Sequence, residues 1–339
     1  MCACFGVRRR EPSLKAVANA TAVQSGTLPA TVPSVVTQQP PKRRWILGLL
    51  SIALLIFLYR FFTVYTVRSG DCRPKPVDPA LRLLTRDEHG QPVSYPERIG
   101  FPPQQRPLVV MSYNIAGHDE LYDADHIQQI AAAINQVKPD IVGLQEVHRK
   151  TWQARFHDQL RELERLTGMH GYFGTSYKQW GGAFGDAVLT RGEFLSNEVH
   201  ELPSVGEPRI VIESVIRLDQ TTISFYTTHL TTWGQLNRAN RRQQLECLAR
   251  HVRTSRWPYI LVGDFNAPPD TPEIQEFRRM NAAQLAGESI GPTHEMTGKR
   301  IDYIFADYGW EVRGARALTI GSSDHWPITA ELLWNRGGS

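Results

Sequence analysis

The stretch Tyr259-Ile260-Leu261-Val262-Gly263-Asp264-Phe265-Asn266 decides the fold. Its four leading apolar residues predict a buried strand, which ends at a turn that carries two polar side chains. Five further motifs place acidic, amide or histidine residues at the end of an apolar run: Ser112-Tyr113-Asn114-Ile115, Gln145-Glu146-Val147, Thr228-His229-Leu230, Arg300-Ile301-Asp302-Tyr303 and Ser323-Asp324-His325-Trp326-Pro327. Polar residues that repeatedly end strand-like runs predict one rim at which the strand ends converge.

The residue types on this rim indicate its chemistry. Three Asp, one Glu, two His and two Asn at strand ends are hard to explain as packing. Carboxylate and amide oxygens bind hard divalent cations, and imidazoles that remain free can transfer protons. This combination suits the hydrolysis of a phosphate ester.

Taken in order, the motifs Gly-Asp-Phe-Asn, Asp-Tyr and Ser-Asp-His-x-Pro resemble those of the endonuclease/exonuclease/phosphatase superfamily, the DNase I-like metallophosphoesterases. The resemblance runs from about residue 108 to about residue 333 and implies an α/β fold, a two-sheet, four-layer α/β sandwich. The hydrophobic pattern agrees with a mixed fold. It predicts helices at 125–137, 152–166 and 236–252, and strands at 108–111, 141–144, 187–190, 210–215, 223–228, 259–262, 303–305 and 328–333.

The resemblance also implies a metal group. Glu146 would be the principal Mg²⁺ ligand, with Mn²⁺ as an alternative ion, and Asp324 would lie on the metal side. Glu146 follows a buried-looking strand, where a bare carboxylate is costly unless it is paired or metal-bound. Asn114 joins this group, and because an amide cannot act as a base, we expect it to orient groups near the metal and the phosphate.

The remaining motif residues are expected to be catalytic. By resemblance, Asp264 and Asn266 orient the attacking water and the phosphoryl oxygens. His325 would contact the phosphate or activate water while Asp302 holds its ring, since such a carboxylate fixes the tautomer and stabilises the imidazolium. His229 would protonate the leaving oxygen or contact the phosphate, so the division of roles between the two histidines stays open.

Two residues are candidates for substrate binding. Arg209 could clamp the phosphate, with a surface ion pair as the alternative. Tyr177 is a second, weaker candidate. Asp186 stands where the family segment usually has Asn, and we expect this difference to add negative charge near the cleft. The other histidines have no motif partner and are expected to be ordinary surface or core residues: His118, His126, His148, His157, His170, His200, His251 and His294.

Charge is divided unevenly along the chain. Residues 1–75 hold 11 Lys/Arg and 2 acids, whereas the remaining residues hold 27 Lys/Arg and 32 acids, so the net charges are +9 and −5. A domain that grips a nucleic-acid backbone usually carries a basic face. The balance therefore favours a lipid-linked or small phosphoester over DNA or RNA, with a metal-dependent nuclease as the alternative. A non-catalytic membrane scaffold that retains the fold is the alternative of another class.

The N-terminal third predicts a membrane anchor. Residues 1–44 form a basic tail whose composition is typical of disorder. Residues 45–67 are apolar apart from Arg60, and as a helix of about 34 Å they would cross a bilayer core of about 30 Å. A cleaved signal peptide is the alternative, but no Ala-x-Ala type site follows the apolar run. Residues 68–107 are expected to be a tether, and residues 108–339 the catalytic domain.

The basic cluster Lys42-Arg43-Arg44 lies closer and denser on the N-terminal side of the predicted span than the basic residues on the other side. The charge rule then predicts a single-pass protein with its catalytic domain on the non-cytoplasmic side. The four cysteines, Cys2, Cys4, Cys72 and Cys247, predict neither a disulfide framework nor a zinc site. Cys247 is expected to be a small buried apolar residue, and S-acylation of Cys2 and Cys4 is conceivable in a eukaryotic cell. The sequence predicts no particular oligomeric state.

Overall fold

The computed structural model describes residues 48–55, 67–72, 106–118, 125–179, 181–232, 235–280 and 283–334. Contacts divide the chain into residues 1–52 and residues 53–339. In the described part of the N-terminal region, residues 48–55 are helical with exposed side chains. Among the described helices, none has the length and apolar character needed to span a bilayer. Most of the predicted span 45–67, the tail 1–44 and most of the tether 68–107 lie outside the described residues.

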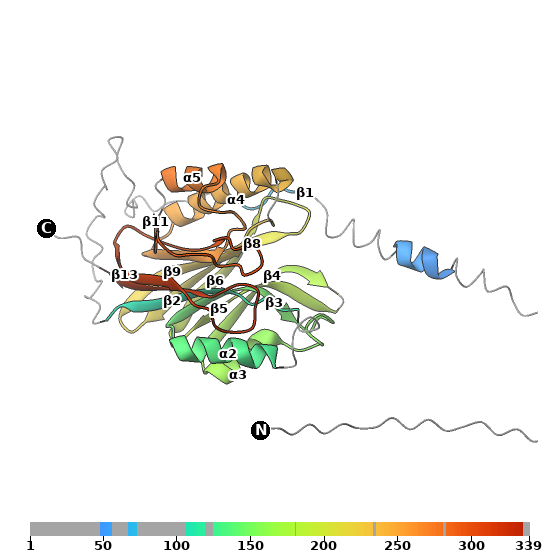
Figure 1. Cartoon of the computed structure of the whole chain (residues 1–339), viewed down its shortest axis with the longest axis horizontal. Helices are drawn as coiled ribbons and strands as arrows, with labels where there is room; N and C mark the ends of the chain where they lie inside the picture. The colour runs from blue at the N-terminus through green and yellow to red at the C-terminus, as the bar shows by residue number, and fades with distance from the viewer. Residues whose placement is uncertain are drawn as a thin grey trace, which may run out of the picture. The chain divides into compact units, whose positions relative to one another are not determined.

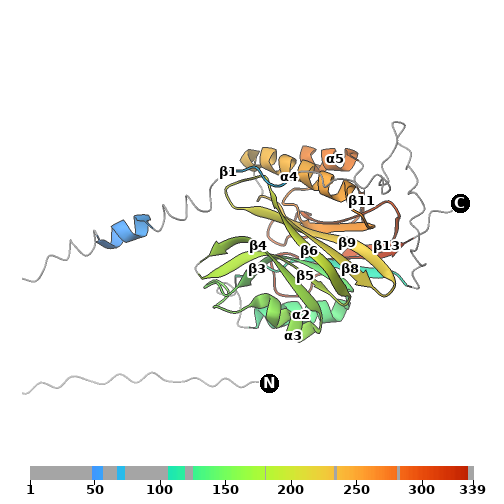
Figure 2. The ribbon, with the colours of Figure 1, turned by 180° about the vertical axis from the view of Figure 1, so that it is seen from behind.

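The catalytic region is a four-layer sandwich, as the resemblance predicts (Figures 1 and 2). One six-stranded sheet has the order β11-β12-β10-β9-β8-β6 and the other β13-β14-β2-β3-β5-β4. Helices α4 and α5 cover the outer face of the first sheet, and α2 and α3 cover the second (Figure 1). The helices are α2 (His126–Val137), α3 (Gln159–Thr167), α4 (Gln235–Arg253) and α5 (Pro272–Arg279).

The strands pair in both directions within each sheet. Their bounds are β1 (Val67–Arg68), β2 (Leu108–Asn114), β3 (Ile141–Arg149), β4 (His170–Gln179), β5 (Gly182–Thr190), β6 (Glu193–Leu202), β7 (Ser204–Val205), β8 (Arg209–Leu218), β9 (Thr221–His229), β10 (Tyr259–Asp264), β11 (Gln284–Leu285), β12 (Asp302–Ala306), β13 (Trp310–Ala317) and β14 (Ile328–Trp334). Each sheet contains one parallel pair, β2 with β3 and β9 with β10.

Buried apolar side chains fill three spaces between the layers. Ile212, Phe225 and Val262 belong to the core between the two sheets. Leu248 of α4 and Phe277 of α5 pack on the first sheet, and Ile130 of α2 packs on the second. The sheets approach so closely at Gly143 that a Cβ there would lie 2.3 Å from a Val262 methyl carbon. This close contact fixes the ends of β3 and β10 relative to each other.

The predicted helix at 152–166 begins later than its apolar pattern indicates. Residues 152–156 form turns, with positive φ angles at Arg155 and Phe156, and α3 starts at Gln159. The Asp158 side chain accepts a hydrogen bond from the Arg161 amide and caps the helix. A carboxylate at the N-cap satisfies an otherwise unpaired amide, so this position defines the helix start. Gly168 ends the helix, as predicted, in the left-handed region.

The prediction that the cysteines form no disulfide is wrong. Cys72 and Cys247 are bonded across 175 residues of sequence, so Cys247 is buried but is not a free thiol. Val67, the last residue of the predicted span 45–67, and the first residues of the predicted tether are also fixed to the domain. Val67 pairs with Val205 in a two-stranded sheet, and the Asp71 amide donates to the Glu201 carbonyl oxygen at 2.7 Å.

Candidate active site

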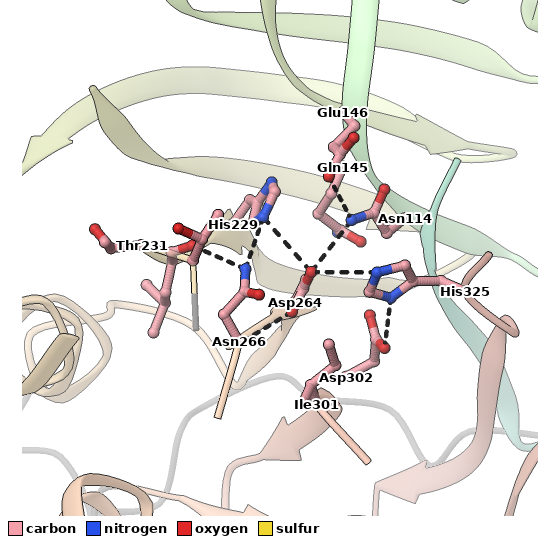
Figure 3. A network of polar contacts seen from close by, with 12 residues as sticks. Asn114, Gln145, Glu146, His229, Thr231, Asp264, Asn266, Ile301, Asp302 and His325 are labelled. Atoms are coloured by element: carbon pink, nitrogen blue, oxygen red, sulfur yellow. Dashed lines mark hydrogen bonds and ion pairs between the residues drawn. The ribbon is translucent and has the colours of Figure 1, made fainter. Parts of the chain in front are cut away.

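The topology brings the motif residues to one rim (Figure 3). Asn114 ends β2, and His229 and Asp264 end the parallel pair β9 and β10. The antiparallel partners start where these strands end: Asp302 opens β12 opposite Asp264, and His325 lies three residues before β14. We call the group Asn114, Glu146, His229, Asp264, Asn266, Asp302 and His325 the catalytic rim.

Glu146 reaches the rim through a bulge in β3. The register with β5 shifts between Leu144 and Val147, and Glu146 has a φ of 59°. A non-glycine residue in the left-handed region is strained by about a kcal/mol or more and persists only where its surroundings hold it. Here the Gly117 amide donates to the Glu146 carbonyl oxygen at 3.1 Å. The bulge leaves the Glu146 side chain half-buried beside Asn114.

Asn114 links the two acidic parts of the rim. Its Nδ2 donates to Glu146 Oε1 at 3.0 Å and to Asp264 Oδ2 at 3.2 Å. Its Oδ1 accepts a hydrogen bond from the Ala116 amide at 3.0 Å. Asn114 therefore presents an NH₂ group to both carboxylates, which fits the predicted orienting role and not that of an oxygen ligand.

Asp264 lies at the centre of the rim and is buried. Its Oδ1 accepts a hydrogen bond from the Asn266 amide at 2.8 Å. Its Oδ2 lies 3.5 Å from His229 Nε2 and 3.7 Å from His325 Nε2. Burial, together with the nearby Asp302 charge, raises the pKa of Asp264 to about 7, although His325 opposes the shift.

His325 and Asp302 form the predicted pair. His325 Nδ1 lies 2.9 Å from Asp302 Oδ2, and the Thr293 hydroxyl donates to the same oxygen at 2.6 Å. Burial lowers the pKa of His325, but the Asp302 and Asp264 carboxylates outweigh it and raise the pKa to about 10. The ring is therefore an imidazolium at neutral pH.

His229 has the opposite electrostatic character. The Asn266 amide nitrogen lies 2.8 Å from His229 Nε2, and because that nitrogen can only donate, Nε2 accepts. Burial, followed by the charges of Arg209 and His325, lowers the pKa of His229 well below its usual value. The neutral ring then carries its proton on Nδ1, which is buried and has no hydrogen-bond partner among the described residues.

The two substrate-binding candidates occupy different places. The Arg209 side chain is only 4% exposed, and its guanidinium forms an ion pair with the part-exposed Glu207 at 3.1 Å. Its charge acts on His229, which places it beside the catalytic rim. Tyr177 lies on β4 with its ring 5.2 Å from that of Phe184.

Asp186 does not add the expected negative charge. It is buried on β5, and burial raises its pKa to about 8 despite the opposing charge of Arg209. Glu146 and Asp264 raise the pKa further. At neutral pH Asp186 is mainly protonated, so it resembles the neutral Asn that usually stands at this position in the family.

Sequence reasoning missed two histidines near the rim. His294 Nε2 lies 3.7 Å from Asp324 Oδ2, and its ring stands edge-on to that of His325 at 4.7 Å. His148, two residues after Glu146, is buried, and burial lowers its pKa to about 3. Neither belongs to a motif. No sequence signal marks either residue, because the bulge at Glu146 breaks the strand period that would relate it to His148.

The acidic and histidine groups of the rim can hold a divalent metal. One ligating atom each from Asp264, Asp302 and His325 lies within 4.8 Å of the others, and the same is true of His294, Asp324 and His325. Asp302 Oδ1 is buried without a hydrogen-bond partner among the described residues, as expected of an oxygen that faces a ligand. The structure pairs Asp324 with His294 and links Glu146 to the centre of the rim through Asn114.

Residues 111–325 match the Endonuclease/Exonuclease/phosphatase family, and the chain belongs to that family. It is a hydrolase that acts on phosphate esters. Family members typically depend on a divalent metal and act on phosphorylated substrates, including nucleic acids. A comparison with curated proteins gives no match.

Solved structures share the fold at low sequence identity. An endonuclease/exonuclease/phosphatase from Beutenbergia cavernae is 22% identical over 68% of this chain and 72% of its own, with a TM-score of 0.59. The human Nocturnin catalytic domain with bound sulfate is 23% identical over 68% and 96%, with a TM-score of 0.55. A mannosyl-6-phosphatase from Bacteroides thetaiotaomicron is 21% identical over 66% and 99%, with a TM-score of 0.53.

Proposed function

We propose that this chain is a membrane-anchored, Mg²⁺-dependent phosphoesterase that hydrolyses a phosphorylated lipid or a small phosphoester at the membrane surface. The catalytic rim is the observation that carries the proposal. It combines a cationic His325, a neutral His229 and a set of carboxylates around one point.

Each rim residue has a role that follows from its contacts. The His325 imidazolium, held by Asp302, opposes the charge that develops on the phosphoryl group. Asp264, with a pKa raised to about 7, orients the attacking water and can accept its proton. Asn266 fixes the ring of His229 through its Nε2, the nitrogen that lies 3.5 Å from Asp264 Oδ2. Asp264 is thus assigned the role of the base, and His229 that of a contact to the phosphate or the leaving oxygen.

Glu146 would hold the Mg²⁺ ion, with Asp324 as a further oxygen donor. Carboxylate oxygen is the preferred ligand of this hard cation. The bound ion would act as a Lewis acid that neutralises phosphate charge. Asn114 would keep the Glu146 and Asp264 carboxylates in place through its two N–H groups.

An exposed loop that follows the strand carrying Glu146 supports a membrane-accessible substrate. Residues 150–157 follow the strand that carries Glu146, and the Lys150 amide donates to the His157 carbonyl oxygen at 2.7 Å, which closes the loop. Trp152 is 48% exposed and Phe156 67% exposed, with the exposed cations Lys150 and Arg155 on the same loop. Aromatic and basic side chains together favour the interface of an anionic bilayer.

The disulfide supports a catalytic domain on the non-cytoplasmic side. The bond between Cys72 and Cys247 is of a kind that persists in oxidising compartments. This agrees with the orientation predicted from the basic cluster before residue 45. The predicted single-pass anchor at 45–67 would then hold the rim close to a membrane substrate.

A substrate panel tests this proposal. The full-length chain, reconstituted in liposomes with Mg²⁺, is assayed against phosphorylated lipids, soluble sugar or inositol phosphates, DNA and RNA. We expect the highest kcat/KM on a lipid or small phosphoester. The variant Trp152→Ser/Phe156→Ser should reduce lipid turnover and leave that of a soluble ester unchanged. Nucleic acid as the best substrate would overturn the proposal in favour of a nuclease.

A further inference from the structure

A second group of metal-binding side chains lies away from the catalytic rim. We call it the His200 cluster: Glu198 and His200 on β6, Glu213 on β8, with His251 of α4 beside them. Glu213 stands four residues along β8 from Arg209, which is roughly 13 Å at about 3.3 Å per residue. The sequence gives no motif for this group, because its members come from three separate elements.

The cluster lies on the outer face of the first sheet. Glu198 is opposite Glu213 in the β6–β8 register, and His200 is opposite Val211. Val211 belongs to the core beneath α4 and α5, so this face of the sheet is the one that the helices cover. The hydrolytic site does not use any of these side chains.

The distances fit a metal ion. His200 Nε2 lies 3.3 Å from Glu213 Oε2 and 3.7 Å from Glu198 Oε2, and the three ligating atoms lie within 4.8 Å of one another. Ligands of a tetrahedral zinc ion with bonds of about 2.0–2.2 Å are separated by about 3.4 Å. An ion can therefore be placed among the three atoms with small side-chain shifts.

Neighbouring groups orient the ligands. Glu213 Oε1 accepts a hydrogen bond from the buried Tyr226 hydroxyl at 3.0 Å, which leaves Oε2 to face His200. Such outer contacts are typical of metal sites, where they fix the direction of ligating carboxylates. His251 Nε2 donates to the Asp71 carbonyl oxygen at 2.9 Å, so the ring is held 4.4 Å from that of His200.

Charge also favours a cation. Two carboxylate oxygens approach one imidazole nitrogen, and a divalent cation among the three atoms would be attracted by both carboxylates. His200 is 8% exposed and Glu213 11% exposed in their side chains, so the charges are poorly screened by water, whereas Glu198 is exposed and gives an ion a route from solvent.

We propose that Glu198, His200 and Glu213 form a structural Zn²⁺ site, separate from the hydrolytic one. Mixed imidazole and carboxylate ligands suit Zn²⁺, whereas Mg²⁺ prefers oxygen ligands alone. Water would fill the fourth position of a tetrahedral ion. The ion ties β6 to β8 next to Asp71 and Cys72, where the N-terminal arm joins the domain, and so stabilises that junction.

Zinc binding to the purified full-length chain in detergent tests the site. The protein is stripped with chelator, supplied with Zn²⁺ in the presence of excess Mg²⁺, and analysed for metal content and thermal unfolding. To remove competition from the catalytic rim, the same measurement is made on Glu146→Gln. We expect one tightly held Zn²⁺ per chain in both proteins and a rise in Tm on zinc binding.

Variants decide whether the zinc is held by this cluster. His200→Gln and Glu213→Gln should lose the bound Zn²⁺ and the zinc-dependent rise in Tm. Glu198→Gln, at an exposed position that does not affect folding, should weaken Zn²⁺ binding tenfold or more. The matched control Glu201→Gln, on the same strand and exposed, should bind as the unaltered chain does. Absence of zinc in the unaltered protein, or equal binding by Glu198→Gln, would overturn the proposal.

Discussion

Substitution of Asp302 by Asn is the sharpest test of the pair that His325 and Asp302 form. The change keeps the size of the side chain but removes the charge that stabilises the imidazolium. The pKa of His325 stands at about 10 against an ordinary value of 6.5. At about 1.36 kcal/mol per pKa unit, this difference corresponds to about 5 kcal/mol of interaction with the charged ring.

The expected loss of kcat depends on how much of this interaction energy comes from Asp302 and how much from Asp264. Asp302 contributes both a charge and a hydrogen bond, whereas Asp264 contributes only a charge, so Asp302 accounts for the larger part of the stabilisation of the charged ring. Because each 1.36 kcal/mol is a factor of about ten in rate, Asp302→Asn should lower kcat roughly 100-fold. Thr293→Val is the control that keeps the Asp302 charge. It removes the hydroxyl bond to Asp302 Oδ2 and the two bonds that the Ile301 and Asp302 amides donate to Thr293 Oγ1, and it should lower kcat less than Asp302→Asn does.

The pH profile of kcat tests the direction in which Asp302 shifts the pKa of His325. A raised pKa means that the charged ring is present below about pH 10 and is lost as the pH rises through that value. The alkaline limb of kcat should therefore lie near pH 10 for the unaltered enzyme and move toward neutral pH in Asp302→Asn. In a double-mutant cycle with His325→Ala, removing both residues should cost about as much as removing one. Multiplicative losses and an unmoved limb would refute the pairing.

Three further outcomes are expected. Replacing both Cys72 and Cys247 by Ala should lower the free energy of unfolding, measured in denaturant titrations, by about 2–5 kcal/mol. Equal stability of the unaltered chain and this double variant under oxidising conditions would contradict a stabilising disulfide. The full-length chain should stay with membranes through a carbonate or high-salt wash, because residues 45–67 are expected to anchor it. Release of the intact protein by salt would contradict the predicted anchor. Duplex DNA should bind weakly and with a shallow salt dependence, since the region after residue 75 is acidic, and a steep log–log slope near −0.9 per contacted phosphate with efficient nicking would favour a nuclease.

The rim was predictable because its residues end or open strands that are themselves easy to recognise. The uncharged runs 108–111, 141–144 and 259–262, which lead to Asn114, Glu146 and Asp264, hold no polar side chain other than the Tyr259 hydroxyl, as expected of strands buried on both faces. The side chains at their ends meet because a parallel pair in each sheet directs them to one edge. The hydrogen bonds of Asn114, by contrast, depend on the bulge at Glu146, and no local sequence pattern predicts that bulge.

The missed features depend on contacts between distant parts of the chain. Cys72 and Cys247 are 175 residues apart and belong to no spacing pattern. His294 reaches the rim through a turn, and an isolated bridge pairs it with His325. Strands β4, β6 and β13 have many exposed or half-buried positions, so they lack the apolar runs that mark the inner strands.

The central claim is that the rim around Glu146 hydrolyses a phosphate ester with a divalent metal. The most direct measurement is the Mg²⁺ dependence of hydrolysis by the full-length chain and by Glu146→Gln, with folding checked by circular dichroism. A neutral amide is a poorer ligand for a hard dication. Glu146→Gln should therefore stay folded, lose activity at low Mg²⁺ and recover part of it at high Mg²⁺. Full activity of the folded variant in trace metal would contradict the claim.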